Sequence, residues 1–309
     1  MINQEIFTFP SAAEGVTVTG FFFAPEGQAR AIVQIAHGMI DRIGRYTELI
    51  EALLASGYAV AANDHIGHGE TAKSKEEFGH FGRRGARYDL IADMHEVSRQ
   101  ARLRFGELPL ILIGHSMGSF LARLYAEKWG SELSALVLLG TSGKNPAVPL
   151  GKLVADLISL LRGRRHRSRL LAQMTFMGYL SHFKDEHSRF SWLTRDPDWR
   201  LKLGEDTLCR FIFTVSAYRE LFSMLGEVNR SDWFKNLPKD LPILLASGDE
   251  DPVGAYGRGV RSVAASLCKK GSSDVRLLLY PDARHELHHE TNRGEFFSDL
   301  LSYLAGVIG

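Results

Sequence analysis

The chain has 309 residues, of which 45% are hydrophobic and 24% charged, close to the average for soluble globular proteins. This composition excludes a disordered chain and a collagen-like repeat, and the two cysteines, Cys209 and Cys268, are too few for a disulfide scaffold. A formal net charge of +1 gives no overall attraction to nucleic acid or acidic lipid. Residues 1–5 do not resemble a signal peptide, and no apolar run reaches the ~20 residues of a membrane span. We therefore predict a soluble, cytoplasmic protein with reduced cysteines and no nucleic-acid partner.

Short apolar runs alternate along the chain with longer amphipathic segments. In chain order, strands are predicted at residues 16–23, 31–36, 58–62, 109–113, 135–139, 242–246 and 275–280. Helices are predicted at residues 46–56, 88–105, 120–129, 259–269 and 295–307. Strands that are apolar throughout and separated by helices indicate an α/β protein with a parallel sheet covered on both faces. Two short N-terminal strands are expected to pair as an antiparallel edge.

The alternation stops between about residues 142 and 230. This stretch has helical patterns, many aromatic residues and no convincing strand. We predict a helical cap, residues 142–230, inserted in a core formed by residues 1–141 and 231–309.

A Gly-His-Ser-Met-Gly motif at residues 114–118 directly follows the predicted strand 109–113 and opens a helix. A serine at a sharp strand-to-helix turn requires small neighbours two residues away, because strand and helix approach closely there. The turn exposes the hydroxyl at the carboxyl edge of the sheet, beside the free N–H groups of a helix N-terminus. Ser116 is therefore a candidate nucleophile.

A serine hydroxyl needs a base to take its proton, and the base needs an orienting acid. In a sheet of this kind the expected chain order is serine, acid, histidine. His285 follows the last predicted strand and supplies the base. Asp249, Glu250 and Asp251 follow the strand before it, and composition alone does not choose among them.

Four motifs together resemble the α/β-hydrolase fold, and more narrowly its monoacylglycerol lipase and lysophospholipase branch. They are His-Gly-Met-Ile-Asp-Arg-Ile-Gly-Arg-Tyr at 37–46, Asp-His-Ile-Gly-His-Gly at 64–69, the serine motif at 114–118, and Gly-Asp-Glu-Asp at 248–251. The insertion corresponds in position to the cap of that family. One departure is Asp41, which stands where the family has Glu.

The resemblance implies a triad of Ser116, His285 and Asp251. Pro252 agrees with the choice of Asp251, because it biases the preceding residue toward an extended backbone. The resemblance also implies an oxyanion hole made by the backbone N–H groups of Met39 and Met117. Their side chains can pack in the apolar interior at the same time.

The activity implied is hydrolysis of monoacylglycerol-like or lysophospholipid-like esters through an acyl-enzyme, with no cofactor and no metal. His37, His65 and His115 are expected to hold loops through hydrogen bonds rather than act as bases, and His68 is expected in a turn. The sequence leaves the oligomeric state open.

A second reading concerns residues 285–289, His-Glu-Leu-His-His, which match the H-E-x-x-H pattern of zinc hydrolases. In that reading His285 and His289 bind the metal and Glu286 is the base. The longer form of the pattern fails, because Asn292 stands where glycine is required. The position of His285 after the last strand also favours the serine scheme.

An arginine-rich tract, residues 162–169, follows a predicted helix whose apolar residues lie at residues 150–161. Such a helix can rest transiently on a membrane surface, or it can cover the active site with its arginines in solvent. The second alternative is favoured from the sequence. Two other functions stay open: a thioesterase or acyltransferase on the same triad, and a non-catalytic ligand-binding member of the fold.

Overall fold

The computed structural model describes residues 3–233 and 235–309, and an eight-stranded sheet runs through the centre of this part in the order β1-β2-β4-β3-β5-β6-β7-β8. The strands are β1 (Gln4–Pro10), β2 (Thr17–Phe23), β3 (Ala31–Ala36), β4 (Tyr58–Asn63), β5 (Leu110–His115), β6 (Ala135–Leu139), β7 (Ile243–Gly248) and β8 (Val275–Tyr280). β2 pairs antiparallel with β1 and β4, and the other neighbours pair parallel. The predicted α/β architecture is confirmed. The N-terminal edge is antiparallel, but its outer strand is β1, for which no range was predicted, and the predicted strands 16–23 and 31–36 do not pair with each other. The expectation that residues 1–5 do not form part of a signal peptide concerns Met1 and Ile2 as well, and these two lie outside the described residues.

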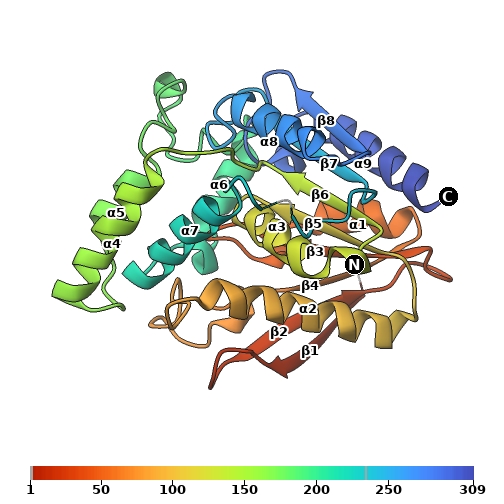
Figure 1. The fold of residues 1–309 in the computed structure, drawn as a ribbon, viewed down its shortest axis with the longest axis horizontal. Coiled ribbons are helices and arrows are strands. Elements are labelled where there is room, and N and C mark those ends of the chain that lie inside the picture. The colour runs from red at the N-terminus through yellow and green to blue at the C-terminus, as the bar shows by residue number, and fades with distance from the viewer. Residues whose placement is uncertain (1–2, 234) are drawn as a thin grey trace.

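Helices cover both faces of this sheet, as the fully apolar strands predict. One face carries α2 (Ala86–Phe105), α3 (Met117–Trp129) and α8 (Arg258–Lys269), and the other carries α1 (Thr47–Ala55) and α9 (Arg293–Ile308) (Figure 1). The buried side chains form two main clusters, one on each side of the sheet. None of the helices in the described part of the chain is long and apolar enough to cross a membrane.

The segment between β6 and β7 forms a helical insertion beside the sheet. It contains α4 (Val148–Arg162), α5 (Arg169–Thr175), α6 (Pro197–Glu205) and α7 (Val215–Glu227). Residues 142–230, whose backbone the structure describes throughout, contain no strand beyond an isolated bridge between Arg167 and Thr214. The side chains of Ser168, Asp196 and Thr214 cap the N-termini of α5, α6 and α7, which explains where these helices begin.

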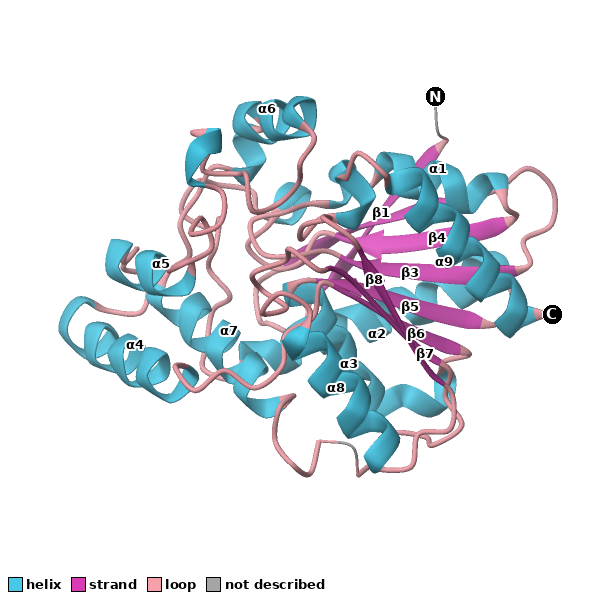
Figure 2. Ribbon diagram, turned by 90° about the horizontal axis from the view of Figure 1, so that it is seen from above, coloured by secondary structure: helices cyan, strands magenta, loops and turns pink. Residues whose placement is uncertain are grey.

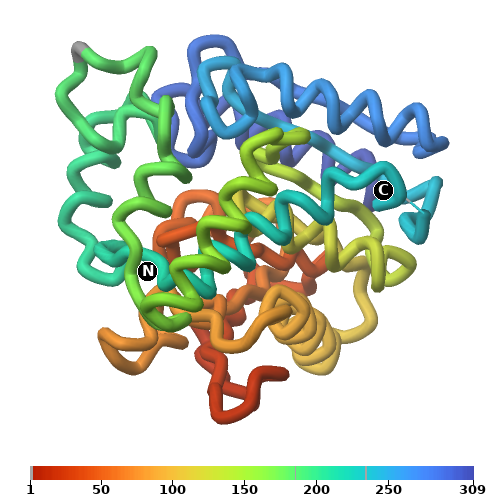
Figure 3. Tube along the Cα trace, turned by 60° about the vertical axis from the view of Figure 1, so that its left-hand side comes forward, coloured from red at the N-terminus to blue at the C-terminus, as the bar shows by residue number. Residues whose placement is uncertain are grey.

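The insertion lies at the edge toward which the parallel strands point (Figure 2). Figure 3, in which this green-to-teal segment comes forward, shows it in front of the core. The carboxyl ends of parallel strands meet at one edge of a sheet, and ligands of open α/β proteins bind there. Loops that follow β3, β5, β7 and β8 therefore face the insertion across a common space.

Candidate active site

Ser116 stands at the turn between β5 and α3. Its backbone has φ 54° and ψ −119°, a strained combination for a residue with a side chain, and its N–H donates to the Leu139 carbonyl at 2.9 Å. A Cβ atom on Gly118 would lie 2.0 Å from the carbonyl oxygen of Ala36, and one on Gly114 would lie 2.4 Å from that of Gly118. The two glycines of the motif are therefore required by the close approach of β3, β5 and α3. The turn leaves the serine half-buried.

His285 and Asp251 come from the loops after β8 and β7 and meet in the interior. Nδ1 of His285 lies 2.9 Å from Oδ2 of Asp251, and both residues are buried. Asp251 also accepts hydrogen bonds from the Ser247 hydroxyl at 3.1 Å and the Val253 N–H at 2.8 Å, which fix its orientation. When Nδ1 donates to Asp251, the unprotonated Nε2 is free to accept a proton, and it has no hydrogen-bond partner among the described residues. Such a nitrogen often meets its nucleophile only when substrate is bound.

The other two carboxylates of this turn point elsewhere. Oε2 of Glu250 lies 3.3 Å from Nδ1 of His182, and both side chains are exposed. The backbone of Asp249 is held by Tyr280, whose carbonyl accepts its N–H at 3.1 Å, and no hydrogen bond joins its side chain to His285 within the described residues. Of the three carboxylates that the sequence left open, the structure brings Asp251 to the imidazole.

The loop after β3 brings the Met39 N–H toward the serine turn. A Cβ atom on Gly38 would lie 3.2 Å from Cβ of Ser116, so this loop runs directly against the serine. Within the described residues no hydrogen bond occupies the backbone N–H groups of Met39 and Met117. Two such donors on either side of a serine can receive a developing oxyanion.

Buried histidines hold the Met39 loop in place. His37 donates from Nδ1 to the Gly38 carbonyl at 2.8 Å and accepts the His65 N–H on Nε2 at 2.9 Å. His68 accepts the Ile40 N–H on Nε2 at 3.3 Å, and burial lowers the pKa of its imidazole to about 3, which keeps it neutral. The ring of His65 packs against the ring of His37, with the two centroids 4.2 Å apart, and the backbone N–H of His65 is the donor to His37.

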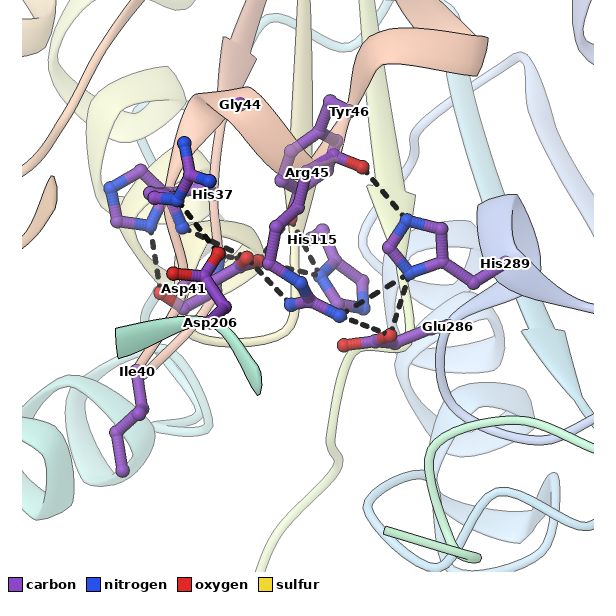
Figure 4. Close-up of polar contacts among 12 residues, drawn as sticks. His37, Ile40, Asp41, Gly44, Arg45, Tyr46, His115, Asp206, Glu286 and His289 are labelled. Carbon is purple, nitrogen blue, oxygen red and sulfur yellow. Dashed lines mark hydrogen bonds and ion pairs between the residues drawn. The ribbon is translucent and has the colours of Figure 1, made fainter. Parts of the chain in front are cut away.

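A buried network of charges lies beneath the Met39 loop and the His285 loop. The guanidinium of Arg45 donates at 2.7 Å to Asp41 on one side and at 2.7 Å to Glu286 on the other (Figure 4). Tyr46 donates its hydroxyl to Asp41 at 2.7 Å and lies 2.9 Å from Nδ1 of His115, whose Nε2 is 3.3 Å from the carbonyl oxygen of His285. His115 thus contacts both Tyr46 and the backbone of the His285 loop, as its expected role in holding a loop requires.

Arg45 is the largest of the influences that lower the pKa of its two carboxylate partners. Burial by itself would raise the pKa of the Asp41 carboxyl, but Arg45, His115 and His37 together outweigh burial and hold that pKa well below its usual value. Glu286 behaves in the same way, with a pKa held well below its usual value by Arg45 and His289. Both carboxylates therefore stay ionised in the interior. Asp41, the residue that departs from the family motif, reaches its partners despite its shorter side chain.

The H-E-x-x-H residues do not form a two-histidine face. Leu287–His289 is a 3₁₀ turn rather than the α-helix that this motif requires. His289 lies 2.7 Å from Glu286 through Nδ1 and 2.8 Å from the Arg45 carbonyl through Nε2, whereas His285 faces Asp251. In the described residues, no three His, Cys, Asp or Glu side chains come together as metal ligands. The residues present do not fit the zinc reading.

A cavity of about 1460 Å³ opens between the sheet edge and the insertion, and Ser116 and His285 line it together. Core residues at its floor include Met39, Met117, Asp41 and Arg45. The insertion supplies mainly apolar walls, among them Val148, Met174, Phe176, Trp192, Leu208, Ile212, Leu221, Phe222 and Leu225. The cavity exceeds the roughly 300–1,000 Å³ of typical small-ligand sites. It therefore combines an apolar volume with a polar floor at the serine.

The insertion also holds the His285 loop. Arg284 donates to Glu186 at 2.9 Å and to the Ser191 carbonyl at 2.5 Å. Glu290, which is buried, accepts from Arg195 at 2.9 Å and from the backbone N–H of Arg284 at 2.9 Å. The loop that carries His285 is thus tied to the insertion through Arg284 and Glu290, and to the core through the contact of Glu286 with Arg45.

Sequence reasoning predicts Ser116, Asp251 and His285 as the triad, but it does not predict the Arg45 network or the contacts of Arg284. The arginine in Gly-Arg-Tyr, residues 44–46, was a signal, since it precedes a predicted helix together with the oxyanion motif. Glu286 carried a signal only for the zinc pattern. Sequence adjacency did not reveal that Glu286 and Arg45 are partners.

The sheet order and the serine turn after the central strand β5 define the α/β-hydrolase fold. More particularly, the chain belongs to the Hydrolase_4 family: the family model described as serine aminopeptidase, S33, matches residues 27–292.

Several of the proteins that this chain resembles are named as lipases or esterases. Monoglyceride lipase of Rattus norvegicus is 26% identical over 289 residues, which cover 90% of this chain and 82% of the relative. Monoacylglycerol lipase of Mycolicibacterium smegmatis is 26% identical over 306 residues, covering 94% of this chain and 93% of the relative. A thermostable carboxyl esterase from Bacillus coagulans, solved in complex with glycerol, superposes with a TM-score of 0.92 at 29% identity, and the match covers 100% of both chains. The chain is a carboxylic ester hydrolase of the monoacylglycerol lipase-like branch, and the non-catalytic alternative falls away.

Proposed function

We propose that this enzyme hydrolyses monoacylglycerols, with lysophospholipids as further substrates, through Ser116, His285 and Asp251. The observation that carries the proposal is the apolar cavity of about 1460 Å³ that Ser116 and His285 line, with Nδ1 of His285 held 2.9 Å from Oδ2 of Asp251. An acyl chain fits such walls, since each buried methylene contributes ~0.8 kcal/mol. The relatives named as monoglyceride lipases support the same substrate class.

In the proposed mechanism, Oγ of Ser116 attacks the ester carbonyl while Nε2 of His285 takes its proton. The carbonyl oxygen becomes an oxyanion that the N–H groups of Met39 and Met117 stabilise, at a few kcal/mol for each donor. His285 then gives the proton to the leaving alcohol, which leaves Ser116 acylated. Water attacks the acyl-enzyme by the same route in reverse and releases the fatty acid. Asp251 keeps Nδ1 of His285 protonated and stabilises the imidazolium.

We assign residues 142–230 as the cap of this enzyme, inserted between core segments 1–141 and 231–309. Its apolar side chains form the wall against which the acyl chain would lie, and α4 contributes Val148 and Gly151 to that wall. A substrate of this kind comes from a lipid phase, so the cap is also the part proposed to touch a membrane transiently. The exposed leucines of α4 support that contact. A cytoplasmic location stays a prediction, in keeping with two unpaired cysteines, Cys209 and Cys268.

The test is labelling with a fluorophosphonate, which reacts with activated serines, followed by peptide mapping to Ser116. A substrate panel then compares monoacylglycerols of increasing chain length with lysophosphatidylcholine, acyl thioesters and an aminoacyl anilide. The proposal expects monoacylglycerols to have the highest kcat/KM. A higher kcat/KM for the thioester would favour the thioesterase alternative, and transfer of the acyl group to an added alcohol in preference to water would favour the acyltransferase. Labelling at another residue would overturn the triad.

A further inference from the structure

A second hollow, of about 510 Å³, opens at the C-terminal end of α4, where the chain passes the loop that precedes α2. It is lined by His80, Gly82, Arg83, Arg162, Gly163, Arg164 and Arg165. These residues are separate from the lining of the serine cavity. Positive charge is therefore concentrated around one hollow that the proposed mechanism does not use.

Three of the arginines carry charge that the protein does not neutralise. The side chains of Arg162, Arg164 and Arg165 are exposed, and none of them makes an ion pair or a hydrogen bond with the described residues. Neighbouring arginines differ: Arg83 donates to Asp89 at 2.5 Å and Arg84 to Asp156 at 3.0 Å. The hollow thus has unpaired guanidinium groups beside arginines that are already satisfied.

The backbone that carries these arginines is fixed. The Arg164 carbonyl accepts the Ser216 N–H at 3.1 Å, and the His166 carbonyl accepts the Val215 N–H at 2.8 Å, which tie the tract to the start of α7. Nδ1 of His80 lies 3.2 Å from the hydroxyls of Thr214 and Ser216, so the imidazole is held at the same place. Because the backbone is already fixed, less conformational entropy is lost when a ligand binds.

The surrounding charge acts on His80 directly. Burial, followed by repulsion from Arg165, Arg164 and Arg167, lowers the pKa of the His80 imidazole to about 4. The ring is therefore neutral at pH 7. An anion in the hollow would meet a positive potential that no carboxylate of the lining offsets, since the lining holds neither Asp nor Glu.

The hollow adjoins an exposed apolar face of α4. The leucines of this face recur at helical spacing and are 52–83% exposed: Leu150, Leu153, Leu157, Leu160 and Leu161. With a rise of 1.5 Å per residue, the face extends for about 16 Å and ends at Arg162. α4 lies at the periphery of the molecule, away from the sheet (Figures 1 and 2). An apolar helix face that ends in unpaired cations matches the interface of an anionic bilayer, where acyl chains lie below phosphates.

We propose that the hollow formed by His80, Arg83 and residues 162–165 binds the phosphate of an anionic phospholipid headgroup while the leucine face of α4 rests on the bilayer. Guanidinium groups suit this ligand, because they form paired hydrogen bonds with phosphate oxygens. The adjoining leucines favour a lipid over a soluble polyanion, which would need charge alone. The inference rests on the membrane contact proposed above and adds the lipid class that the enzyme selects.

The test is cosedimentation of the full-length enzyme with vesicles of phosphatidylcholine, with and without phosphatidylglycerol. The variant Arg164→Gln/Arg165→Gln should bind the anionic vesicles about 25-fold more weakly than wild type, since each basic residue near such a surface contributes roughly five-fold. The matched control Lys269→Gln/Lys270→Gln removes the same charge from two exposed residues at the end of α8 and should change binding less than about two-fold. Leu160→Ser/Leu161→Ser should weaken binding to both kinds of vesicle.

Hydrolysis of a soluble short-chain ester should stay at the wild-type rate in all three variants, so a failure of lipid binding is distinguishable from a failure of the triad. Equal loss in the arginine variant and its lysine control would reduce the effect to net charge and overturn the site. Equal binding of the wild type to vesicles with and without phosphatidylglycerol would also overturn the site. Displacement by inorganic phosphate, without any dependence on Leu160 and Leu161, would assign the hollow to a soluble phosphate. If the Leu160→Ser/Leu161→Ser variant bound RNA as tightly as the wild type does, the ligand of the hollow would be a nucleic acid and the lipid proposal would be overturned.

Discussion

Replacing Arg45 with Met would remove the guanidinium that lies between Asp41 and Glu286 while keeping much of the side-chain volume. Both carboxylates are buried, at 2% and 3% exposure, so the variant leaves two interior charges without this partner. Removing one partner of a buried ion pair costs about 3–5 kcal/mol. With roughly 2.1 cal/mol/K of unfolding entropy per residue, a chain of 309 residues should lose about 5–8 °C in Tm.

The pH dependence of this loss follows from the pKa shifts. In the wild type the folded-state pKa of both carboxyls lies below the unfolded value, so their stabilisation is present at neutral pH and is lost as the pH falls. Without Arg45, burial dominates at Asp41 and raises its folded-state pKa above the unfolded value. The protonated carboxyl is then favoured in the fold, and stability falls as the pH rises through that pKa. The stability gap between Arg45→Met and wild type should widen between about pH 5 and pH 8.

Thermal unfolding across this pH range, together with kcat on a soluble ester, measures both effects. Because Arg45 joins the Met39 loop to the residue after His285, kcat should fall more than KM changes. Arg45→Met/Glu286→Gln should recover part of the stability at high pH, whereas Arg99→Met, which breaks an exposed pair with Glu96, should stay within about 0.5 kcal/mol of wild type. A Tm for Arg45→Met within about 1 °C of wild type at pH 8, with a parallel pH profile, would refute the reasoning.

Four further outcomes are expected. Ser116→Ala should lose on the order of 10⁴ or more in kcat with an unchanged Tm, and a folded variant with a tenth of the activity would contradict the triad. Asp251→Asn should cost ~10⁴ by favouring the wrong imidazole tautomer, while Asp249→Asn and Glu250→Gln, assayed in parallel, should stay within about three-fold. Ester hydrolysis should persist after dialysis against EDTA, and its loss with recovery on added zinc would favour a metal enzyme. Gly118→Ala should lower Tm and soluble yield, since its Cβ would meet the Ala36 carbonyl, and overpacking of this kind costs at least ~1–3 kcal/mol.

The core strands could be predicted closely because burial on both faces leaves a continuous apolar run. The bounds of β3, β6 and β8 agree with residues 31–36, 135–139 and 275–280. β1 had no predicted range, since all of its residues except Ile6, Phe7 and Phe9 are polar or proline and most are exposed. α3 begins at Met117, three residues before the predicted helix, because the strained Ser116 is its N-cap residue. A hydrophobic pattern does not reveal a turn of that kind.

The candidate triad was accessible to sequence reasoning because motif and chain order place Ser116 and His285 at the same sheet edge. The charged network was not, since Arg45 and Glu286 are 241 residues apart and neither local motif identifies the other residue as its partner. Trp192 illustrates the same limit within the insertion. Aromatic content predicted an apolar lining, but the packing of the Trp192 ring, 5.2 Å from that of His285, depends on how the insertion folds back.

The contacts between the insertion and the His285 loop bear on how this enzyme can be recombined with its relatives. A chimera that exchanges all of residues 142–230 would discard Glu186 and Arg195, the partners of Arg284 and Glu290. The graft would then change the orientation of the base along with the substrate wall, and the two effects would be confounded. A crossover that keeps residues 183–200 native would exchange the rest of the insertion's cavity lining and leave the contacts of the histidine loop intact. The natural unit of exchange in this chain is thus smaller than the insertion.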